Sequence, residues 1–299
     1  MAPTNLPASV EARLRSLALE RGEDVAAIRS RYAIERLLYR ISQSPHATRF
    51  VLKGSNLFAA WTGQMHRPTK DADFLAFGDP SIESIAQTIR EVCRLAVVPD
   101  GLTFVEGSVE ADRIKEDQEY EGVRVRLFCH LAKPAAQIRV QLDFGFGDAV
   151  QPVDADYPAM LDFPAPRLRA YPREAVMAEK LHAVVTLGET NTRMKDFYDL
   201  WTMANQFDFD GPVLLAAVRA TFDRRRTAFV DAVPMALAPE FYARPDKAAL
   251  WGNFIANNGL TAPAFPAVGE QLRAFALPVY RMGGMVAESL GNWKAGVGW

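Results

Sequence analysis

The sequence predicts an α+β fold in which a sheet domain is followed by a helical domain. Two segments, Glu121–Leu131 and Ala136–Phe146, alternate apolar and polar residues as half-buried strands do. After Tyr171 and Pro172 the chain follows a helical spacing almost throughout. Three shorter apolar strands are expected at Phe50–Leu52, Asp71–Phe77 and Leu102–Glu106.

Domain boundaries follow from the same patterns. Residues 9–42 read as two amphipathic helices that are separated near Gly22. Residues 150–166 are rich in Pro and Asp, which is typical of a linker or domain rim. We therefore predict an α/β domain with N-terminal helices over residues 1–165 and a helical domain over residues 166–299.

Composition excludes several classes of protein. Lys plus Arg is 34 and Asp plus Glu is 36, so a nucleic acid would have to bind to a local basic patch. The two cysteines, Cys93 and Cys129, have no metal-ligand spacing and are expected to be buried thiols. No secretory signal or run long enough for a membrane span is apparent, so we expect a cytoplasmic protein without a membrane partner.

Two carboxylates stand out on one expected strand. Asp71 and Asp73 are two residues apart and therefore point to the same face. They repel each other unless a cation lies between them, and Mg²⁺ binds through one or two carboxylates plus substrate phosphates. Two solvated aspartates at the start of a strand are the alternative. Leu75 and Phe77 should continue this face toward the core.

A third carboxylate comes from the strand at residues 137–146. Asp143 lies on its polar face, and Arg139 lies on the same face. The preceding strand presents Arg124 and Arg126 in the same way. If the two strands pair, these four side chains share one open surface, and Asp143 becomes a candidate third metal ligand. An ordinary exposed sheet face is the alternative.

A glycine turn precedes these carboxylates. Gly54 follows the strand at Phe50–Leu52 and lets the backbone approach a ligand closely. Ser55 is expected to cap the next short helix, where its hydroxyl and nearby N–H groups could hold a phosphate. Gly-Ser before a helix is common, so the turn is informative only together with the aspartates.

Two helices of the expected helical domain carry unusual charges. Lys180 lies on or beside the apolar stripe of one helix, where it either extends its head to solvent or meets an anion such as a triphosphate. In the next helix Asp196 and Asp199 share one side. Arg193 and Lys195 lie in its first turn, against the helix dipole, which indicates an anionic ligand or an acidic partner group. Local Arg193–Asp196 and Lys195–Asp199 pairs are the alternative.

The order of these motifs resembles that of the DNA polymerase β-type nucleotidyltransferase superfamily. More narrowly, it resembles the AbiEii/AbiGii toxin family, to which the MenT toxins belong. The resemblance spans residues 50–200. It rests on Lys53-Gly54-Ser55-Asn56-Leu57, Arg67-Pro68-Thr69-Lys70-Asp71-Ala72-Asp73, Tyr171-Pro172-Arg173-Glu174, Ala178-Glu179-Lys180-Leu181-His182-Ala183 and Arg193-Met194-Lys195-Asp196-Phe197-Tyr198-Asp199-Leu200.

The resemblance implies a nucleotidyltransferase toxin of a type IV toxin–antitoxin (AbiE-like, abortive-infection) system, with an AbiEi-like winged-helix antitoxin as partner. MenT-like members are similar to enzymes that modify the 3′ end of tRNA. By position, Asp71, Asp73 and Asp143 would bind Mg²⁺ or Mn²⁺, and Lys180 would bind the triphosphate of the NTP. Asp196 and Asp199 would complete the catalytic site, whereas Gly54, Ser55, Arg193 and Lys195 would help bind the nucleotide. Thr69 matches a hydroxyl position that is phosphorylated in some members.

Other functions share parts of this pattern. A phosphatase or glycosyltransferase can also use Asp-x-Asp, but the residues around Asp71 match a haloacid-dehalogenase site poorly. A non-catalytic nucleotide- or RNA-binding protein that retains the fold is the other alternative. The run Arg224–Arg226 is expected to cap a helix, with an RNA contact as its alternative.

Overall fold

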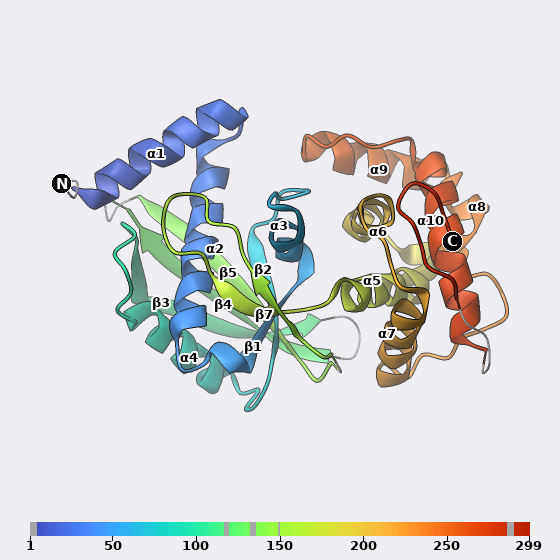
Figure 1. Ribbon diagram of the computed structural model, residues 1–299, viewed down its shortest axis with the longest axis horizontal. Helices are drawn as coiled ribbons and strands as arrows, with labels where there is room; N and C mark the ends of the chain where they lie inside the picture. The colour runs from blue at the N-terminus through green and yellow to red at the C-terminus, as the bar shows by residue number, and fades with distance from the viewer. Residues whose placement is uncertain (1–4, 117–119, 132–135, 149, 286–289) are drawn as a thin grey trace. The chain divides into compact units, whose positions relative to one another are not determined.

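The computed structural model describes residues 5–116, 120–131, 136–148, 150–285 and 290–299. The chain divides into two compact units (Figure 1). The first comprises residues 1–148 and 152–171, and the second comprises residues 149–151 and 172–299. None of the described helices is both long and apolar enough to cross a membrane.

The first unit is built on a seven-stranded mixed sheet in the order β3-β4-β5-β2-β1-β7-β6. Neighbouring strands are antiparallel except for the parallel pairs β2–β5 and β1–β7. The strands are β1 (Phe50–Lys53), β2 (Asp71–Ala76), β3 (Thr103–Glu116), β4 (Tyr120–His130), β5 (Gln137–Phe146), β6 (Val153–Asp156) and β7 (Arg167–Ala170).

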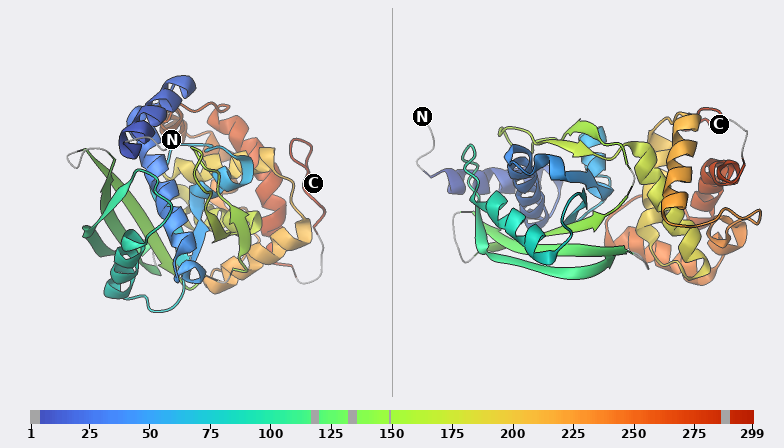
Figure 2. Two further views of the ribbon diagram at one scale, coloured as in Figure 1. Left: turned by 60° about the vertical axis from the view of Figure 1, so that its left-hand side comes forward. Right: turned by 90° about the horizontal axis from the view of Figure 1, so that it is seen from below.

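Helices cover one face of this sheet. Figure 2 shows α2 and α4 on the same side of the strands, where α2 contacts β5 and α4 contacts β3 and β4. As the sequence predicts, α1 ends at Gly22, whose φ of 64° is left-handed and whose N–H bonds to the carbonyls of Ala18 and Leu19. The helices are α1 (Leu6–Arg21), α2 (Val25–Gln43), α3 (Leu57–Thr62) and α4 (Ile82–Arg94), with 3-10 turns at Ala47–Arg49 and Gly54–Asn56.

The core of this unit lies between the helices and the apolar face of the sheet. Three rings from adjacent strands, Phe50, Phe74 and Phe144, are fully buried and in mutual contact. Leu142 and Phe144 alternate along β5 with the polar positions Gln141 and Asp143, as the sequence predicts. The sheet therefore has one apolar face and one face that is free to carry charged groups.

The second unit is helical. Helix α10 packs against α6, α7, α8 and α9. The core of the unit contains the rings of Phe197, Phe241, Tyr242 and Phe265, which contact one another. The helices are α5 (Arg173–Leu187), α6 (Met194–Gln206), α7 (Gly211–Arg224), α8 (Pro239–Tyr242), α9 (Pro245–Asn257) and α10 (Phe265–Gly283), with 3-10 turns at Gly188–Thr190 and Met235–Leu237. The two units together confirm the predicted α+β class.

The sheet extends further along the chain than the sequence indicated. The Pro-rich segment expected to be a linker contains β6, which pairs with β7, and β7 in turn pairs with β1. Residues 167–170, expected in the helical domain, therefore belong to the sheet, and the first unit extends to Tyr171. Both strands have only four residues, which is too short for an alternating pattern to be distinctive, and β6 is the partly exposed edge strand.

Two further expectations about strands are wrong. Strand β3 continues past Glu106 to Glu116, because a register shift between Val105 and Glu110 interrupts the alternation without ending the strand. Phe77 does not continue into the core: β2 ends at Ala76, and Phe77 is 39% exposed.

A buried acid on α2 ties the chain after β6 to the core. Glu35 is fully buried, accepts a hydrogen bond of 2.7 Å from the N–H of Met160 and lies 3.1 Å from the guanidinium of Arg36. Arg36 in turn donates to the carbonyl of Pro164 at 2.6 Å. Burial raises the pKa of Glu35 to about 7, although Arg36 and the Met160 N–H act in the opposite direction.

This pKa predicts a specific pH dependence. The folded protein keeps a proton on Glu35 that the unfolded chain loses between about pH 4.5 and 7, so the free energy of unfolding falls as pH rises through that window. Because glutamine cannot ionise, Glu35→Gln should not show this fall. Between pH 5 and pH 8 the free energy of unfolding of the wild type should therefore drop by roughly 3 kcal/mol more than that of Glu35→Gln. Urea unfolding at both pH values measures this difference.

Glu83→Gln, which changes an exposed acid on α4, is the matched control and should follow the wild type at both pH values. Identical pH dependence in Glu35→Gln and wild type would show that Glu35 is already ionised in the folded protein.

Candidate functional site

Three carboxylates converge on the polar face of the sheet. Asp71 and Asp73 lie two residues apart on β2, and the parallel neighbour β5 places Asp143 directly opposite Asp73. An oxygen from each of the three carboxylates lies within 4.8 Å of the others. The structure thus brings together the three residues that the sequence nominated as metal ligands.

This arrangement fits a divalent cation. Three negative charges at such distances repel one another strongly, and an ion between them would reverse the sign of that interaction. Oxygen donors fixed on adjacent strands are the ligands that Mg²⁺ and Mn²⁺ prefer. Asp71 and Asp73 are partly exposed, so an ion and a ligand can reach them, whereas Asp143 is only 6% exposed.

The carboxylates belong to a row of charged residues that crosses five strands in register. Asp73 is opposite Lys53 on β1 and Asp143 on β5, Asp143 is opposite Arg124 on β4, and Arg124 is opposite Asp112 on β3. The two adjacent aspartates are therefore flanked by a cation on each side. Lys53 is buried, and its ammonium group lies 3.7 Å from the carboxylate of Asp148.

Arg124 makes the closest contact with the triad. Its Nε and Nη2 donate to the two carboxylate oxygens of Asp143 at 2.8 and 2.6 Å, the parallel geometry of strong arginine–carboxylate pairs. These hydrogen bonds to Asp143, followed by the charges of Asp71 and Asp73, raise the pKa of Arg124 above its usual value. The sequence placed Arg124 and Asp143 on one surface, and strand pairing turns that proximity into a direct ion pair.

Gly54 lies against the triad from the end of β1. Its φ is +74°, which favours glycine, and a Cβ at this position would come within 2.3 Å of Oδ2 of Asp73. The side chain of Asp73 therefore occupies space that only a glycine leaves open.

The neighbouring Ser55 differs from its prediction. It lies inside the 3-10 turn Gly54–Asn56 and is 3% exposed, and α3 begins at Leu57 without any side-chain cap. Ser55 does not cap the helix, because the 3-10 turn continues directly into α3 with Asn56 already in a helical conformation.

Three polar residues hold the first aspartate in place. Asn56 donates from Nδ2 to the carbonyl of Asp71 at 2.7 Å, and the hydroxyl of Tyr157 donates to Oδ1 of Asn56 at 3.3 Å. Thr69 donates to Oδ1 of Asp71 at 2.8 Å. Sequence reasoning gave no role to Asn56 or Tyr157, although Asn56 directly follows the Gly-Ser pair.

A second charged cluster lies within the helical unit. The ammonium group of Lys180 on α5 is 2.6 Å from Oδ2 of Asp199 and 3.2 Å from Oδ1 of Asp196, both on α6. Arg193 lies 2.8 Å from the other oxygen of Asp196. The two aspartate side chains are almost fully buried, so the cluster holds α5 and the start of α6 together.

These contacts show how the charges of the cluster are paired within the helical unit. Lys180 does not extend to solvent, since its side chain is 12% exposed and meets two anions of its own unit. The expected Arg193–Asp196 pair is present, whereas Asp199 pairs with Lys180 and Lys195 is exposed.

The arginines at the end of α7 lie at the helix C-terminus, as the sequence predicts, with Arg224 in the last turn and Arg225 as the C-cap. The side chain of Arg225 is 9% exposed and lies 3.9 Å from a carboxylate oxygen of Glu179 on α5, with His182 at 3.3 Å. His182 is itself buried, hydrogen-bonded to Thr227 and in edge contact with Phe222. His182 therefore packs inside the helical unit, and Arg225 contributes to the same contact, whereas Arg224 and Arg226 are exposed.

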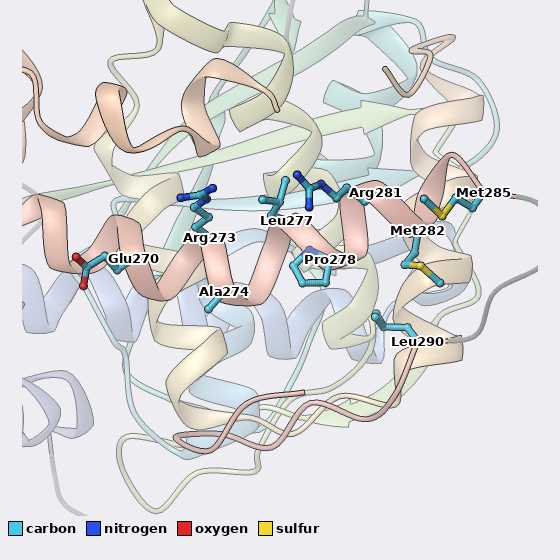
Figure 3. A pocket seen from close by; sticks show the side chains of 9 residues that line it. All are labelled: Glu270, Arg273, Ala274, Leu277, Pro278, Arg281, Met282, Met285 and Leu290. Atoms are coloured by element: carbon cyan, nitrogen blue, oxygen red, sulfur yellow. The ribbon is translucent and has the colours of Figure 1, made fainter. Parts of the chain in front are cut away.

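A shallow groove of about 720 Å³ runs along α10 (Figure 3). It has a mainly apolar lining, and the charged side chains of Arg273, Arg281 and Glu270 extend from the same helix. It has no cluster of carboxylates comparable to that on the sheet, so the chemistry of the chain points to Asp71, Asp73 and Asp143 instead. The groove is lined by Glu270, Arg273, Ala274, Leu277, Pro278, Arg281, Met282, Met285 and Leu290.

A sheet that presents Asp-x-Asp beside a third aspartate and a glycine turn is the arrangement expected of a nucleotidyltransferase. The family model described as "Nucleotidyl transferase AbiEii toxin, Type IV TA system" matches residues 36–274. The chain therefore belongs to the AbiEii family of nucleotidyltransferase toxins. This membership favours the enzyme over the phosphatase, glycosyltransferase and non-catalytic alternatives.

Two solved structures from Helicobacter pylori are similar to this chain. One is JHP933, with 14% sequence identity and a TM-score of 0.48, over 83% of this chain and 89% of that chain. The other is described provisionally as a nucleotidyltransferase, with 14% identity and a TM-score of 0.46, over 83% of this chain and 92% of that chain. No curated protein matches the sequence significantly.

The Gly54 contact generates a prediction with a matched control. Gly54→Ala should weaken Mn²⁺ binding by about tenfold or more, as loss of groups that orient metal ligands does, because the added methyl displaces the carboxylate of Asp73. Gly63→Ala introduces the same methyl at a φ of +78° with no atom within 4 Å. Both variants should lose about 1–2 kcal/mol of stability from left-handed strain, but only Gly54→Ala should lose metal affinity.

Calorimetric titration with Mn²⁺ and thermal melting of both variants make the comparison. Equal Mn²⁺ affinity in the two variants would show that Gly54 does not position Asp73 for a metal.

Proposed function

We propose that this chain transfers a nucleoside monophosphate from an NTP to the 3′ end of tRNA in a reaction that depends on Mg²⁺ or Mn²⁺. The observation that carries the proposal is the convergence of Asp71, Asp73 and Asp143 on one face of the sheet, within reach of a single ion. Family membership supports the nucleotidyl transfer. The tRNA acceptor follows from the resemblance to MenT-like members.

The reaction forms a bond between an acceptor hydroxyl oxygen and the α-phosphorus of the NTP, and pyrophosphate leaves as the hydroxyl proton is lost. Divalent metal, when bound, would lower the pKa of the acceptor hydroxyl and offset charge on the phosphates. Asp71 and Asp73 would hold the metal, and Asp143 would complete its ligand set. Asn56 and Thr69 would keep Asp71 oriented through its backbone carbonyl and its carboxylate.

The site residues of the helical unit are included in the proposal as nucleotide-binding groups. Lys180, with Arg193 and Lys195, would contribute positive charge to the triphosphate, and Asp196 and Asp199 would hold Lys180 in position. The ion pairs of Lys180 with both aspartates support the positioning role of the two acids.

A partner protein follows from the family. A type IV toxin implies an antitoxin, and we propose that the antitoxin is an AbiEi-like winged-helix protein. Expression of the chain in a bacterial host should then slow growth, and co-expression of that partner should restore it.

Asp71→Asn is the direct test of the proposed reaction. Wild-type protein with Mg²⁺, total tRNA and each α-labelled NTP in turn should incorporate label into tRNA. Asp71→Asn should incorporate none, because the amide removes one of the charges that bind the metal. Periodate-oxidised tRNA, which lacks the terminal hydroxyls, should accept no label from either protein.

Asp154→Asn is the control for this test, since Asp154 is an exposed aspartate on β6 of the same sheet and lies outside the triad. This control should retain full incorporation and should still slow growth, whereas Asp71→Asn should do neither. Label entering oxidised tRNA as efficiently as intact tRNA would disprove the 3′-end acceptor. Full activity in folded Asp71→Asn would remove the metal-binding role.

Lys180→Ala separates structural and nucleotide-binding roles. Loss of the ammonium leaves Asp196 and Asp199 buried without this partner, so the melting temperature should fall. If Lys180 also binds the triphosphate, NTP affinity should fall roughly 10- to 150-fold, the worth of one charge-assisted contact. The rise in melting temperature produced by Mg-NTP should then shrink as well.

Arg225→Ala removes another buried cation from the helical unit and serves as the control. It should lower the melting temperature but keep the Mg-NTP-induced rise. A rise of the same size in Lys180→Ala and wild type would restrict Lys180 to the stability of the helical unit.

A further inference from the structure

Both carboxylate oxygens of Asp143 are already hydrogen-bonded in this structure. Arg124 donates one hydrogen bond to each oxygen, at 2.8 and 2.6 Å. An ion that used Asp143 as a ligand would have to compete with a guanidinium in a two-point contact. In this structure Arg124 therefore occupies the oxygens through which Asp143 would bind a metal ion.

The net charge of the site indicates how many divalent ions it can bind while Arg124 is paired with Asp143. Asp71, Asp73 and Asp143 carry three negative charges, and Arg124 offsets one of them. Lys53, the cation on the other side of the row, is balanced by Asp148, whose carboxylate lies 3.7 Å from its ammonium group. One divalent ion then neutralises the remainder. A second divalent ion would meet a site without excess negative charge unless Arg124 left Asp143.

The exposure of the two partners indicates which of them moves. The side chain of Asp143 is 9% exposed and short, and it extends from the interior strand β5. The side chain of Arg124 is 31% exposed and has a long flexible stem. A guanidinium group matches phosphate oxygens as well as it matches a carboxylate. The part of this pair that an incoming triphosphate can displace is therefore Arg124.

We propose that Arg124 is a positioning residue that blocks Asp143 until nucleotide binds. In the nucleotide-free protein, an ion would then bind at the triad without Asp143 as a ligand. The triphosphate then draws the guanidinium away, and Asp143 becomes a ligand only when the substrate is in place. This inference rests on the proposed metal site, and it adds an order of assembly that the site residues alone do not specify.

The test is a titration of the full chain with Mn²⁺ in the absence of nucleotide. The electron paramagnetic resonance signal of free Mn²⁺ measures how much of the ion is bound. Arg124→Gln removes the block and should bind Mn²⁺ about 10- to 100-fold more tightly than wild type, the range expected for releasing charge-assisted hydrogen bonds. Arg139→Gln removes an exposed arginine from the same face of β5, opposite Phe128 rather than the triad, and should leave Mn²⁺ affinity unchanged.

Asp143→Asn makes the experiment a double-mutant cycle. In the wild-type background it should lower Mn²⁺ affinity, because it removes one negative charge and leaves the guanidinium of Arg124 without its carboxylate partner. In the Arg124→Gln background it should abolish the gain. The double variant also removes the unpaired buried charge, so it provides a folded comparison if Arg124→Gln alone is unstable. Arg124→Lys, which keeps the charge but loses the two-point contact, should fall between wild type and Arg124→Gln.

Unchanged or weaker Mn²⁺ binding in Arg124→Gln would overturn the inference, and so would an equal gain in Arg139→Gln. Persistence of the gain in the double variant would also overturn it, since the ligand released by Arg124→Gln would then not be Asp143. These outcomes are distinct from failure of the proposed function, because nucleotide transfer to tRNA is measured separately and does not require Arg124 to act as a block.

Discussion

Repulsion among three carboxylates is the constraint on which the rest of the site depends. The parallel pairing of β2 with β5 forces Asp73 and Asp143 into register, and the period of two along β2 adds Asp71 on the same face. Such a group persists only with cations near it. Lys53 and Arg124 lie on either side in the same row. A divalent ion bound between the three carboxylates would offset the negative charge that these two cations leave.

The surrounding residues can be understood as supports for that arrangement. Gly54 leaves the space that the Asp73 carboxylate occupies, and Asn56 fixes the backbone of Asp71. In the helical unit the same principle applies to a different group, because the buried acids Asp196 and Asp199 are balanced by Lys180 and Arg193. In both places the chain keeps acids in fixed positions by matching them with cations from neighbouring elements.

Local patterns predicted the α+β class, the two apolar-alternating strands, the helix break at Gly22 and the common face of Asp71 and Asp73. They could not predict which strands would be neighbours, because register is set by contacts between distant segments. The ion pair of Arg124 with Asp143 and the hydrogen bonds of Asn56 depend on that register. Strands β6 and β7 were not predicted because each has only four residues, which is too short for a distinctive pattern, and β6 is the exposed edge strand.

The most direct test of the account is a crystal of the full chain grown with Mn²⁺ and a non-hydrolysable NTP, with the anomalous signal of manganese used to locate the ion. The account predicts manganese bound to the carboxylates of Asp71, Asp73 and Asp143, with Arg124 turned from Asp143 toward the phosphates. Manganese bound elsewhere, with the three carboxylates free of metal and nucleotide, would contradict it.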